Sequence, residues 1–233
     1  MKKLIIASTS TIHGSGYLEY LLPTLTTFFA DVKTILFIPY ARPGGISYNE
    51  YTKIAEKAFA KINIAVKGIH EFNNTKEAIQ NAEAIFTGGG NTFELVNQLY
   101  KNDVILTLKQ VLEKGTPYLG TSAGSNICGI DMKNTNDMPI VYPPSFTTLG
   151  IIPFNINAHY LDPLEDSTHM GETRETRIIE FHVFNEVPVL GLREGSWLQV
   201  LEDVISLEGI HSARLFKQNK QPVELESGVD VVL

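Results

Sequence analysis

Short apolar runs alternate with amphipathic stretches through the first 130 residues of the chain. Continuous apolar runs are typical of strands buried on both faces, while apolar residues at three- and four-residue spacing indicate helices. Strands that alternate with helices predict a parallel sheet covered by helices on both faces. We expect strands at residues 3–8, 34–40, 64–68, 84–86 and 117–121, and helices at residues 17–29, 49–61, 92–100 and 104–114.

The second half of the chain is less regular and begins with a proline-rich loop at residues 136–145. We expect strands at residues 151–160, 187–192 and 197–200, a helix at residues 171–184, and a final hairpin formed by residues 213–217 and 222–225 that ends the sheet. The sequence shows no linker-like composition and no internal repeat. It therefore predicts an α/β fold with a mostly parallel sheet, a C-terminal hairpin and a single domain, residues 1–233.

Composition excludes several classes of protein. The 233 residues include 19 Lys and Arg against 26 Asp and Glu, and no basic run occurs, so we expect no nucleic-acid partner. Cys128 is the only cysteine, which excludes a disulfide framework or a cysteine-based zinc site within one chain, and we expect it to be a small buried side chain. The apolar run at the start stops at Ser8, which is too short for a secretory signal. We expect a cytoplasmic protein with no membrane partner, no metal and no cofactor.

A serine stands at the centre of a G-x-S-x-G pattern, Gly120-Thr121-Ser122-Ala123-Gly124. This pattern is typical of a serine on a tight turn between a strand and a helix, where the hydroxyl points away from the sheet. An apolar strand precedes it and small residues that could open a short helix follow it. A glycine- and serine-rich loop is the alternative interpretation.

A nucleophilic serine needs a base and an acid that orients the base. Of the six histidines, His159 follows the apolar run 151–158 and precedes a long polar segment, so it lies at a strand end where a site residue belongs. Asp137 in the proline-rich loop and Glu194 just after the strand 187–192 are both candidates for the acid, and spacing does not choose between them. The other histidines are expected to be structural or solvated (His70, His182, His211) or to lie in loops that could line a pocket (His13, His169).

The oxyanion of an acyl transfer needs backbone N–H donors. The residue after the nucleophile, Ala123, would supply one, and the three glycines Gly88, Gly89 and Gly90 after an expected strand would supply the other. A phosphate-binding loop is the rival interpretation, but the G-x-G-x-x-G and P-loop spacings are both absent.

Together these segments resemble the S51 family of serine peptidases, whose peptidase E members are aspartyl dipeptidases. The resemblance covers residues 1 to about 230 and is carried by Gly88-Gly89-Gly90-Asn91-Thr92, Ser122-Ala123-Gly124 with Asn126, Thr135-Asn136-Asp137-Met138-Pro139-Ile140, Asn157-Ala158-His159-Tyr160, Gly171-Glu172-Thr173-Arg174-Glu175 and Glu194-Gly195. It implies a fold like that of class I glutamine amidotransferases, which is flavodoxin-like, with serine in place of their cysteine. It therefore speaks against the α/β-hydrolase fold that G-x-S-x-G alone would suggest.

The resemblance implies that Ser122 is the nucleophile and His159 the base. Asp137 matches the residue usually given as the third triad member, and Glu194 matches an acid also proposed for that role. Gly90 matches the oxyanion loop. The family often has an aromatic residue where this chain has Thr121, which changes the wall of the pocket but not the mechanism.

The implied activity is hydrolysis of dipeptides with N-terminal aspartate through an acyl-enzyme. Aspartate specificity needs a cation, and a bidentate arginine suits a carboxylate. We favour Arg174 over Arg177, with Asn91 as a further substrate-binding residue; the alternative is that both arginines pair with glutamates on a solvated helix face. Other interpretations are a family member acting on another aspartyl substrate, such as cyanophycin, or an inactive amidotransferase-like binding protein. The expected partner is a small peptide, bound by a monomer or homodimer.

Overall fold

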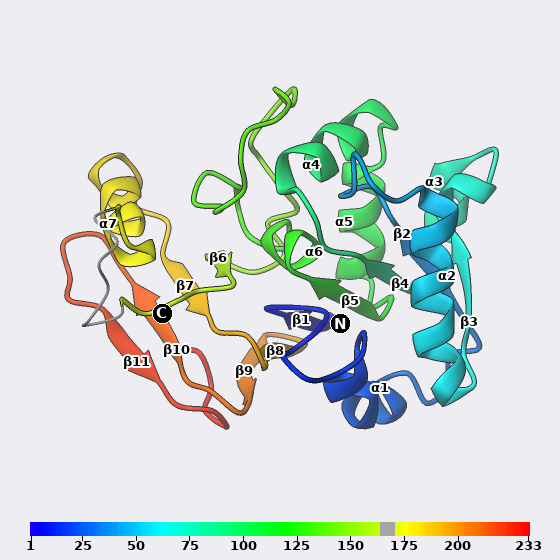
Figure 1. The fold of residues 1–233 in the computed structure, drawn as a ribbon, viewed down its shortest axis with the longest axis horizontal. Helices are drawn as coiled ribbons and strands as arrows, with labels where there is room; N and C mark the ends of the chain where they lie inside the picture. Colours follow the sequence, from blue (N-terminus) through cyan, green and yellow to red (C-terminus); the bar gives the residue numbers. More distant parts are fainter. Residues whose placement is uncertain (164–170) are drawn as a thin grey trace.

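The computed structural model describes residues 1–163 and 171–233 and contains two sheets with helices packed around them (Figure 1). The helices are α1 Leu22–Phe28, α2 Tyr48–Phe59, α3 Thr75–Gln80, α4 Thr92–Lys101, α5 Ile105–Glu113, α6 Ala123–Asn126 and α7 Arg174–Phe184. The strands are β1 Lys3–Ala7, β2 Thr34–Ile38, β3 Ala65–Gly68, β4 Ala84–Thr87, β5 Tyr118–Thr121, β6 Asn155–Ala158, β7 Val189–Leu192, β8 Ser196–Leu201, β9 Val204–Gly209, β10 Ala213–Phe216 and β11 Val223–Leu225.

The larger sheet has the strand order β3-β2-β4-β5-β1-β8-β9. Its first five strands are parallel, and β8 and β9 are antiparallel additions at one edge. Side chains along β1 alternate between two separate apolar clusters: Leu4 and Ile6 face α4 and α5, while Ile5 and Ala7 face α1 and α2. Both faces of the sheet are therefore covered, which confirms the expected mostly parallel sheet flanked by helices.

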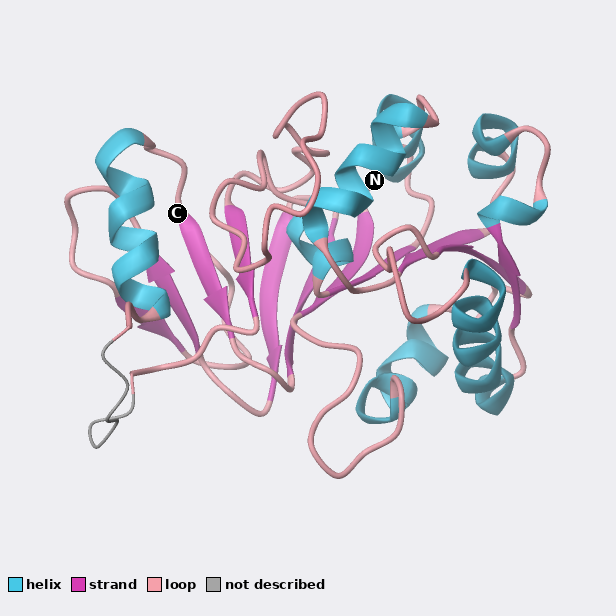
Figure 2. Ribbon diagram, turned by 45° about the horizontal axis from the view of Figure 1, so that its top comes forward, coloured by secondary structure: helices cyan, strands magenta, loops and turns pink. Residues whose placement is uncertain are grey.

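The smaller sheet has the order β11-β10-β7-β6 and carries the expected C-terminal hairpin, β10 with β11 (Figure 2). We expected this hairpin to end a single sheet, and that expectation is wrong. The β8–β9 hairpin ends the larger sheet, and β10 pairs with β7 in the second one. Leu190 and Leu192 of β7 belong to the same apolar cluster as Leu4 of β1, so the two sheets share one core.

Parallel strands of the two sheets present the catalytic candidates at their carboxyl ends, as expected for an open α/β sheet. The glycines Gly88–Gly90 follow β4, Ser122 follows β5, His159 follows β6, and Glu194 comes two residues after β7. Within residues 1–163 and 171–233, none of the helices combines the length and apolarity needed to span a bilayer.

Candidate active site

Ser122 occupies a strained turn between β5 and α6. Its φ of 54° and ψ of −112° lie in a region that favours glycine, and its N–H donates to the carbonyl of Ala7 at 3.1 Å. The flanking glycines are needed for close packing. A Cβ on Gly120 would lie 2.5 Å from the carbonyl oxygen of Gly124, and a Cβ on Gly124 would overlap the carbonyl of Thr87. The structure therefore has the strand, tight turn and short helix that G-x-S-x-G predicts.

His159 reaches Ser122 from the end of β6. Its Nε2 lies 2.8 Å from the Oγ of Ser122. Its backbone has a φ of 56°, and its N–H donates to the buried hydroxyl of Ser8 at 2.9 Å. That hydroxyl donates in turn to the carbonyl of Leu192 at 2.7 Å. Ser8 thus ties the ends of β1, β6 and β7 together and fixes the backbone that carries the imidazole.

Glu194 stands behind His159, because β6 and β7 are parallel neighbours and both residues lie just past their carboxyl ends. The Oε1 of Glu194 lies 2.6 Å from the Nδ1 of His159. An ionised carboxylate can only accept, so Nδ1 carries the proton and Nε2 is left to accept from the Ser122 hydroxyl. This is the tautomer that a general base for Ser122 requires.

Asp137, the other candidate acid, has different partners. Its Oδ2 accepts from the N–H of Thr92 at 2.7 Å and from the hydroxyl of Thr135 at 3.1 Å, so its charge sits at the N-terminus of α4. Within residues 1–163 and 171–233, no hydrogen bond joins Asp137 to His159. The structure brings Glu194 to His159 and uses Asp137 to hold the loop 135–138 against α4.

The glycine segment after β4 packs closely against Ser122. A Cβ on Gly89 would lie 2.9 Å from the Cβ of Ser122 and 3.5 Å from its Oγ. Gly90 has a φ of 144°, and a side chain there would overlap the carbonyl of Ala41. The N–H groups of Gly89, Gly90 and Ala123 donate to no acceptor among the described residues. They are available for an oxyanion.

The predicted substrate-binding residues have separate environments. Arg174 begins α7 and forms no ion pair within the described part of the chain, whereas Arg177 pairs with Glu172 at 3.6 Å. Desolvation and the charge of Arg177 lower the pKa of Arg174, and nearby Asp137 opposes this shift. Asn91 caps α4 by accepting from the N–H of Glu94 and donates to the carbonyl of Met138. Its amide is therefore already paired, and substrate contact by Asn91 stays a prediction.

Several other sequence candidates lie outside this constellation. Cys128 is fully buried, and burial raises the pKa of its thiol, so it is unsuited to nucleophilic attack. His182 is buried on α7 and its Nδ1 lies 3.0 Å from the carbonyl of Asn185. His169 lies outside the described residues. No group of three or more metal-ligating side chains occurs within residues 1–163 and 171–233.

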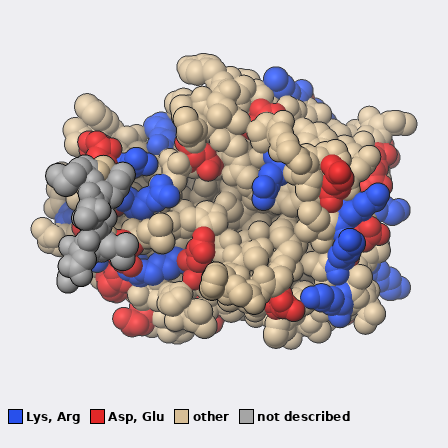
Figure 3. Space-filling view, in the orientation of Figure 1, with Lys and Arg blue, Asp and Glu red and all other residues tan. Residues whose placement is uncertain are grey.

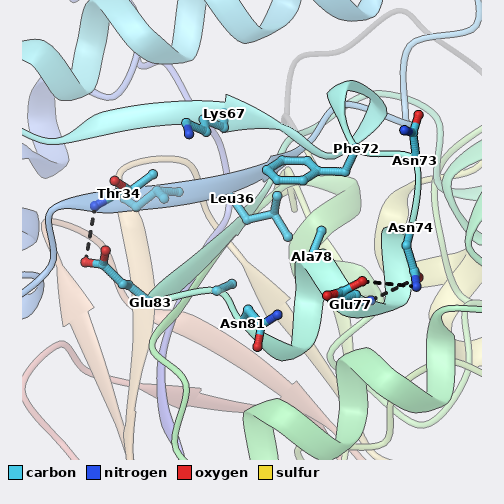
Figure 4. Close-up of a pocket in the computed structure, with 12 residues that line it drawn as sticks. Thr34, Leu36, Lys67, Phe72, Asn73, Asn74, Glu77, Ala78, Asn81 and Glu83 are labelled. Atoms are coloured by element: carbon cyan, nitrogen blue, oxygen red, sulfur yellow. Dashed lines mark hydrogen bonds between the residues drawn. The ribbon is translucent and has the colours of Figure 1, made fainter.

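A cavity of about 550 Å³ beside β2 and α3 lies away from this chemistry (Figure 4). Phe72 and Leu36 form part of its wall, and Glu83 closes one side by accepting from the N–H of Thr34. None of the predicted site residues lines it. The face of the molecule in Figure 3 carries both cations and anions, and several of the cations lie close together on its right-hand side.

Sequence reasoning missed Ser8 and assigned Gly89 no separate role. Ser8 had a positional signal, because it is the last residue of the first expected strand, 3–8, and follows β1 directly at the edge where the other site residues lie. Its hydrogen bonds to residues more than 150 positions away could not be read from the chain.

The chain is similar to known peptidases over nearly its whole length. The sequence model of "Peptidase family S51" matches residues 4–207. The chain is 47% identical over 228 residues to peptidase E of Streptomyces coelicolor, covering 98% of this chain and 93% of the relative. It is 42% identical over 233 residues to a probable alpha-aspartyl dipeptidase of Drosophila melanogaster, covering 99% and 96%.

Solved structures share the fold at low identity. A peptidase from an acI-B1 actinobacterium superposes with a TM-score of 0.75 at 14% identity, covering all of this chain and 97% of the other. A putative peptidase E protein from Listeria monocytogenes has a TM-score of 0.69 at 18% identity, covering 91% and 100%. The match of the family's sequence model and the identities over nearly the whole length show that the chain belongs to peptidase family S51.

Proposed function

We propose that this chain is a serine-type dipeptidase that hydrolyses peptides of the form Asp-X, with Ser122 as nucleophile, His159 as base and Glu194 as the orienting acid. The observation that carries the proposal is the continuous hydrogen-bonded path from the Ser122 hydroxyl through both nitrogens of His159 to Glu194. The relatives named peptidase E and alpha-aspartyl dipeptidase supply the substrate class.

Acylation begins when the Oγ of Ser122 attacks the carbonyl carbon of the aspartyl residue and its proton passes to the Nε2 of His159. The negative charge of Glu194 stabilises the imidazolium that forms. The carbonyl oxygen becomes an oxyanion, which the N–H of Ala123 and an N–H of the Gly89–Gly90 segment stabilise. When the tetrahedral intermediate collapses, His159 protonates the leaving amine, and an aspartyl ester of Ser122 remains.

Deacylation repeats these steps with water as the nucleophile. The Nε2 of His159, neutral again, takes a proton from the water that attacks the ester carbonyl. Collapse of the second intermediate returns the proton to Ser122 and releases aspartate. The exposed fractions of the His159 and Glu194 side chains, 37% and 47%, leave the base open to solvent, so the water can reach it.

Arg174 is the proposed ligand of the aspartyl side-chain carboxylate. Its guanidinium lacks an ion-pair partner among the described residues and is partly buried, which strengthens its attraction for a ligand carboxylate. The neighbouring charge of Asp137 opposes the lowering of the Arg174 pKa, and no hydrogen bond joins the two side chains among the described residues. We propose this arrangement as the origin of a preference for aspartate.

The test measures turnover of Asp-Leu, Glu-Leu and Leu-Leu by the wild type and by Ser122→Ala. We expect Asp-Leu to be preferred, and Ser122→Ala to lose at least about 10³-fold in turnover because the nucleophile is gone. Circular dichroism of the variant controls for folding. Unchanged turnover by Ser122→Ala would remove the nucleophile assignment, and equal turnover of Leu-Leu would remove the aspartate preference.

The complete triad favours an active enzyme over an inactive binding protein. Cleavage of a cyanophycin-type polymer in preference to Asp-Leu would favour the alternative aspartyl substrate. Location in the cytoplasm, a monomeric or homodimeric state, and the absence of a nucleic-acid partner, a metal and a cofactor stay predictions. Cell fractionation, size-exclusion chromatography with light scattering, a nucleic-acid binding assay and activity after dialysis against a chelator test them.

A further inference from the structure

Arg42 lies next to the oxyanion segment. It belongs to the loop that leads from β2 into α2, and its Nε donates to the carbonyl of Gly89 at 3.3 Å. Gly89 is the residue whose backbone packs against Ser122. A single glycine therefore separates a guanidinium group from the nucleophilic serine.

Contacts with Tyr51 and Gly89 hold the guanidinium of Arg42 in place, but no ion pair neutralises its charge among the described residues. Its guanidinium carbon lies 5.4 Å from the centre of the Tyr51 ring, and the Tyr51 hydroxyl donates to the same Gly89 carbonyl at 3.1 Å. No carboxylate of the described residues forms an ion pair with Arg42. Of the five N–H donors of a guanidinium, only Nε is used within residues 1–163 and 171–233. The two terminal NH₂ groups of the guanidinium, a planar fork of donors, are suited to bind an anion.

A cavity of about 350 Å³ adjoins this fork. Its wall includes Arg42, Tyr17, Tyr51, Thr11 and Ile46, so it combines hydroxyl groups with apolar surface. Pockets for small molecules begin at about 300 Å³, so this cavity has room for one amino-acid residue. A residue with a free carboxylate and a variable side chain fits such a wall.

The proposed substrate carries two carboxylates, one on the aspartyl side chain and one at the C-terminus. Two arginines lack acidic partners among the described residues, Arg174 and Arg42. They come from different sides of the nucleophile's helix, because Arg174 begins α7 and Arg42 precedes α2, with α6 between these helices (Figure 1). Each arginine can therefore serve one end of a substrate that lies across Ser122.

Substrate dimensions agree with this division. The C-terminal carboxylate carbon of a dipeptide is three bonds from the scissile carbonyl carbon, which is less than about 4.5 Å. Each further residue would move that carboxylate by up to about 3.5 Å. Only one glycine separates the guanidinium of Arg42 from Ser122. The guanidinium is therefore suited to bind a carboxylate on the residue that directly follows the scissile bond.

We propose that Arg42 binds the C-terminal carboxylate of the substrate and so restricts cleavage to dipeptides. The inference rests on the proposed Asp-X activity and adds to it a specificity for substrates whose second residue carries the C-terminal carboxylate. The ligand is a free α-carboxylate on the leaving residue, whose side chain enters the cavity beside Tyr17 and Tyr51.

The test compares Asp-Leu with Asp-Leu amide, which lacks only the terminal charge. Wild type, Arg42→Gln and Arg42→Lys are compared, and Lys53→Gln, which removes an exposed cation from α2, is the matched control. We expect Arg42→Gln to raise the KM for Asp-Leu by about 10- to 100-fold and to change the KM for the amide by less than about twofold. Arg42→Lys should recover part of the loss, and Lys53→Gln should behave as wild type.

Equal losses on Asp-Leu and on its amide would overturn the proposal, because Arg42 would then act only by holding the carbonyl of Gly89. The proposal would also be overturned if Arg42→Gln no longer distinguished Asp-Leu from Asn-Leu. Arg42 would then bind the carboxylate of the aspartyl side chain. Wild-type protein that cleaves neither Asp-Leu nor its amide would instead refute the Asp-X activity itself, which separates the two failures.

Discussion

Replacement of Glu194 by glutamine tests the assignment of the acid most directly. The Nδ1 of His159 and Oε1 of Glu194 are 2.6 Å apart, so the centres of an imidazolium and the carboxylate would lie roughly 4 Å apart. At that separation the attraction is about 1 kcal/mol in bulk water and about 4 kcal/mol near a protein surface. Because both side chains are 37–47% exposed, we expect an intermediate value, about 3 kcal/mol.

A loss of about 3 kcal/mol corresponds to a fall in kcat of about 10²-fold. The amide that Glu194→Gln introduces could also donate to Nδ1 and hold His159 in the wrong tautomer, which would deepen the loss toward the roughly 10⁴-fold seen for the corresponding change in the serine-protease template. Asp137→Asn is the matched control, because an amide oxygen can still accept from the N–H of Thr92. Its loss of charge at the α4 N-terminus should cost about 0.3–1 kcal/mol of stability and leave kcat within about threefold.

The assay is steady-state hydrolysis of Asp-Leu by both variants, with kcat and KM determined separately and thermal melts recorded for each protein. Glu194→Gln should lower kcat with little change in KM, because it acts on a charge that forms during the reaction. A fall of about 10²-fold or more in Asp137→Asn, with Glu194→Gln near wild type, would refute the reasoning.

Three further outcomes are expected. Ser8→Ala should lower kcat about tenfold with KM unchanged, because the His159 N–H loses its acceptor; an equal rise in KM would contradict a positioning role. Gly124→Ala should destabilise the fold by more than about 3 kcal/mol in urea unfolding, because its Cβ overlaps the carbonyl of Thr87; a change within about 0.5 kcal/mol, the range typical of surface substitutions, would count against the close packing. Burial raises the pKa of the Cys128 thiol above its ordinary value of 9.0, so a thiol reagent near that pH should label it only after denaturant is added, and labelling of the folded protein would refute its burial.

The parallel sheet could be predicted because β1, β2, β4 and β5 are buried on both faces and read as continuous apolar runs. Two other elements, α3 and β9, could not be predicted from the sequence. The helix α3 has six residues and buries only Ile79, so it shows almost no periodicity. The edge strand β9 buries only Leu207 and leaves Val204 55% exposed, so its pattern resembles a loop.

The choice between Asp137 and Glu194 needed the structure, because it depends on how two sheets meet. Both acids lie near strand ends or in loops, and the sequence carries no signal for which strand is the neighbour of β6. Once β7 is placed beside β6, the residues just past both strands must lie close together, and Glu194 is one of them. Asp137 instead accepts a hydrogen bond from the N–H of Thr92, one of the N–H groups at the start of α4 that have no acceptor within the helix.

The strain at Ser122 has a measurable consequence for stability. A side chain at a φ of 54° and ψ of −112° costs of order 1–3 kcal/mol, which glycine would relieve at an entropic cost of about 0.5–1 kcal/mol. Ser122→Gly should therefore be more stable than Ser122→Ala by up to about 2 kcal/mol, or a few degrees in Tm, although both lack the nucleophile. Equal or lower stability of Ser122→Gly would show that the turn is relaxed. A higher Tm would show that the fold gives up stability to hold this hydroxyl against His159, as expected where activity and stability compete at one residue.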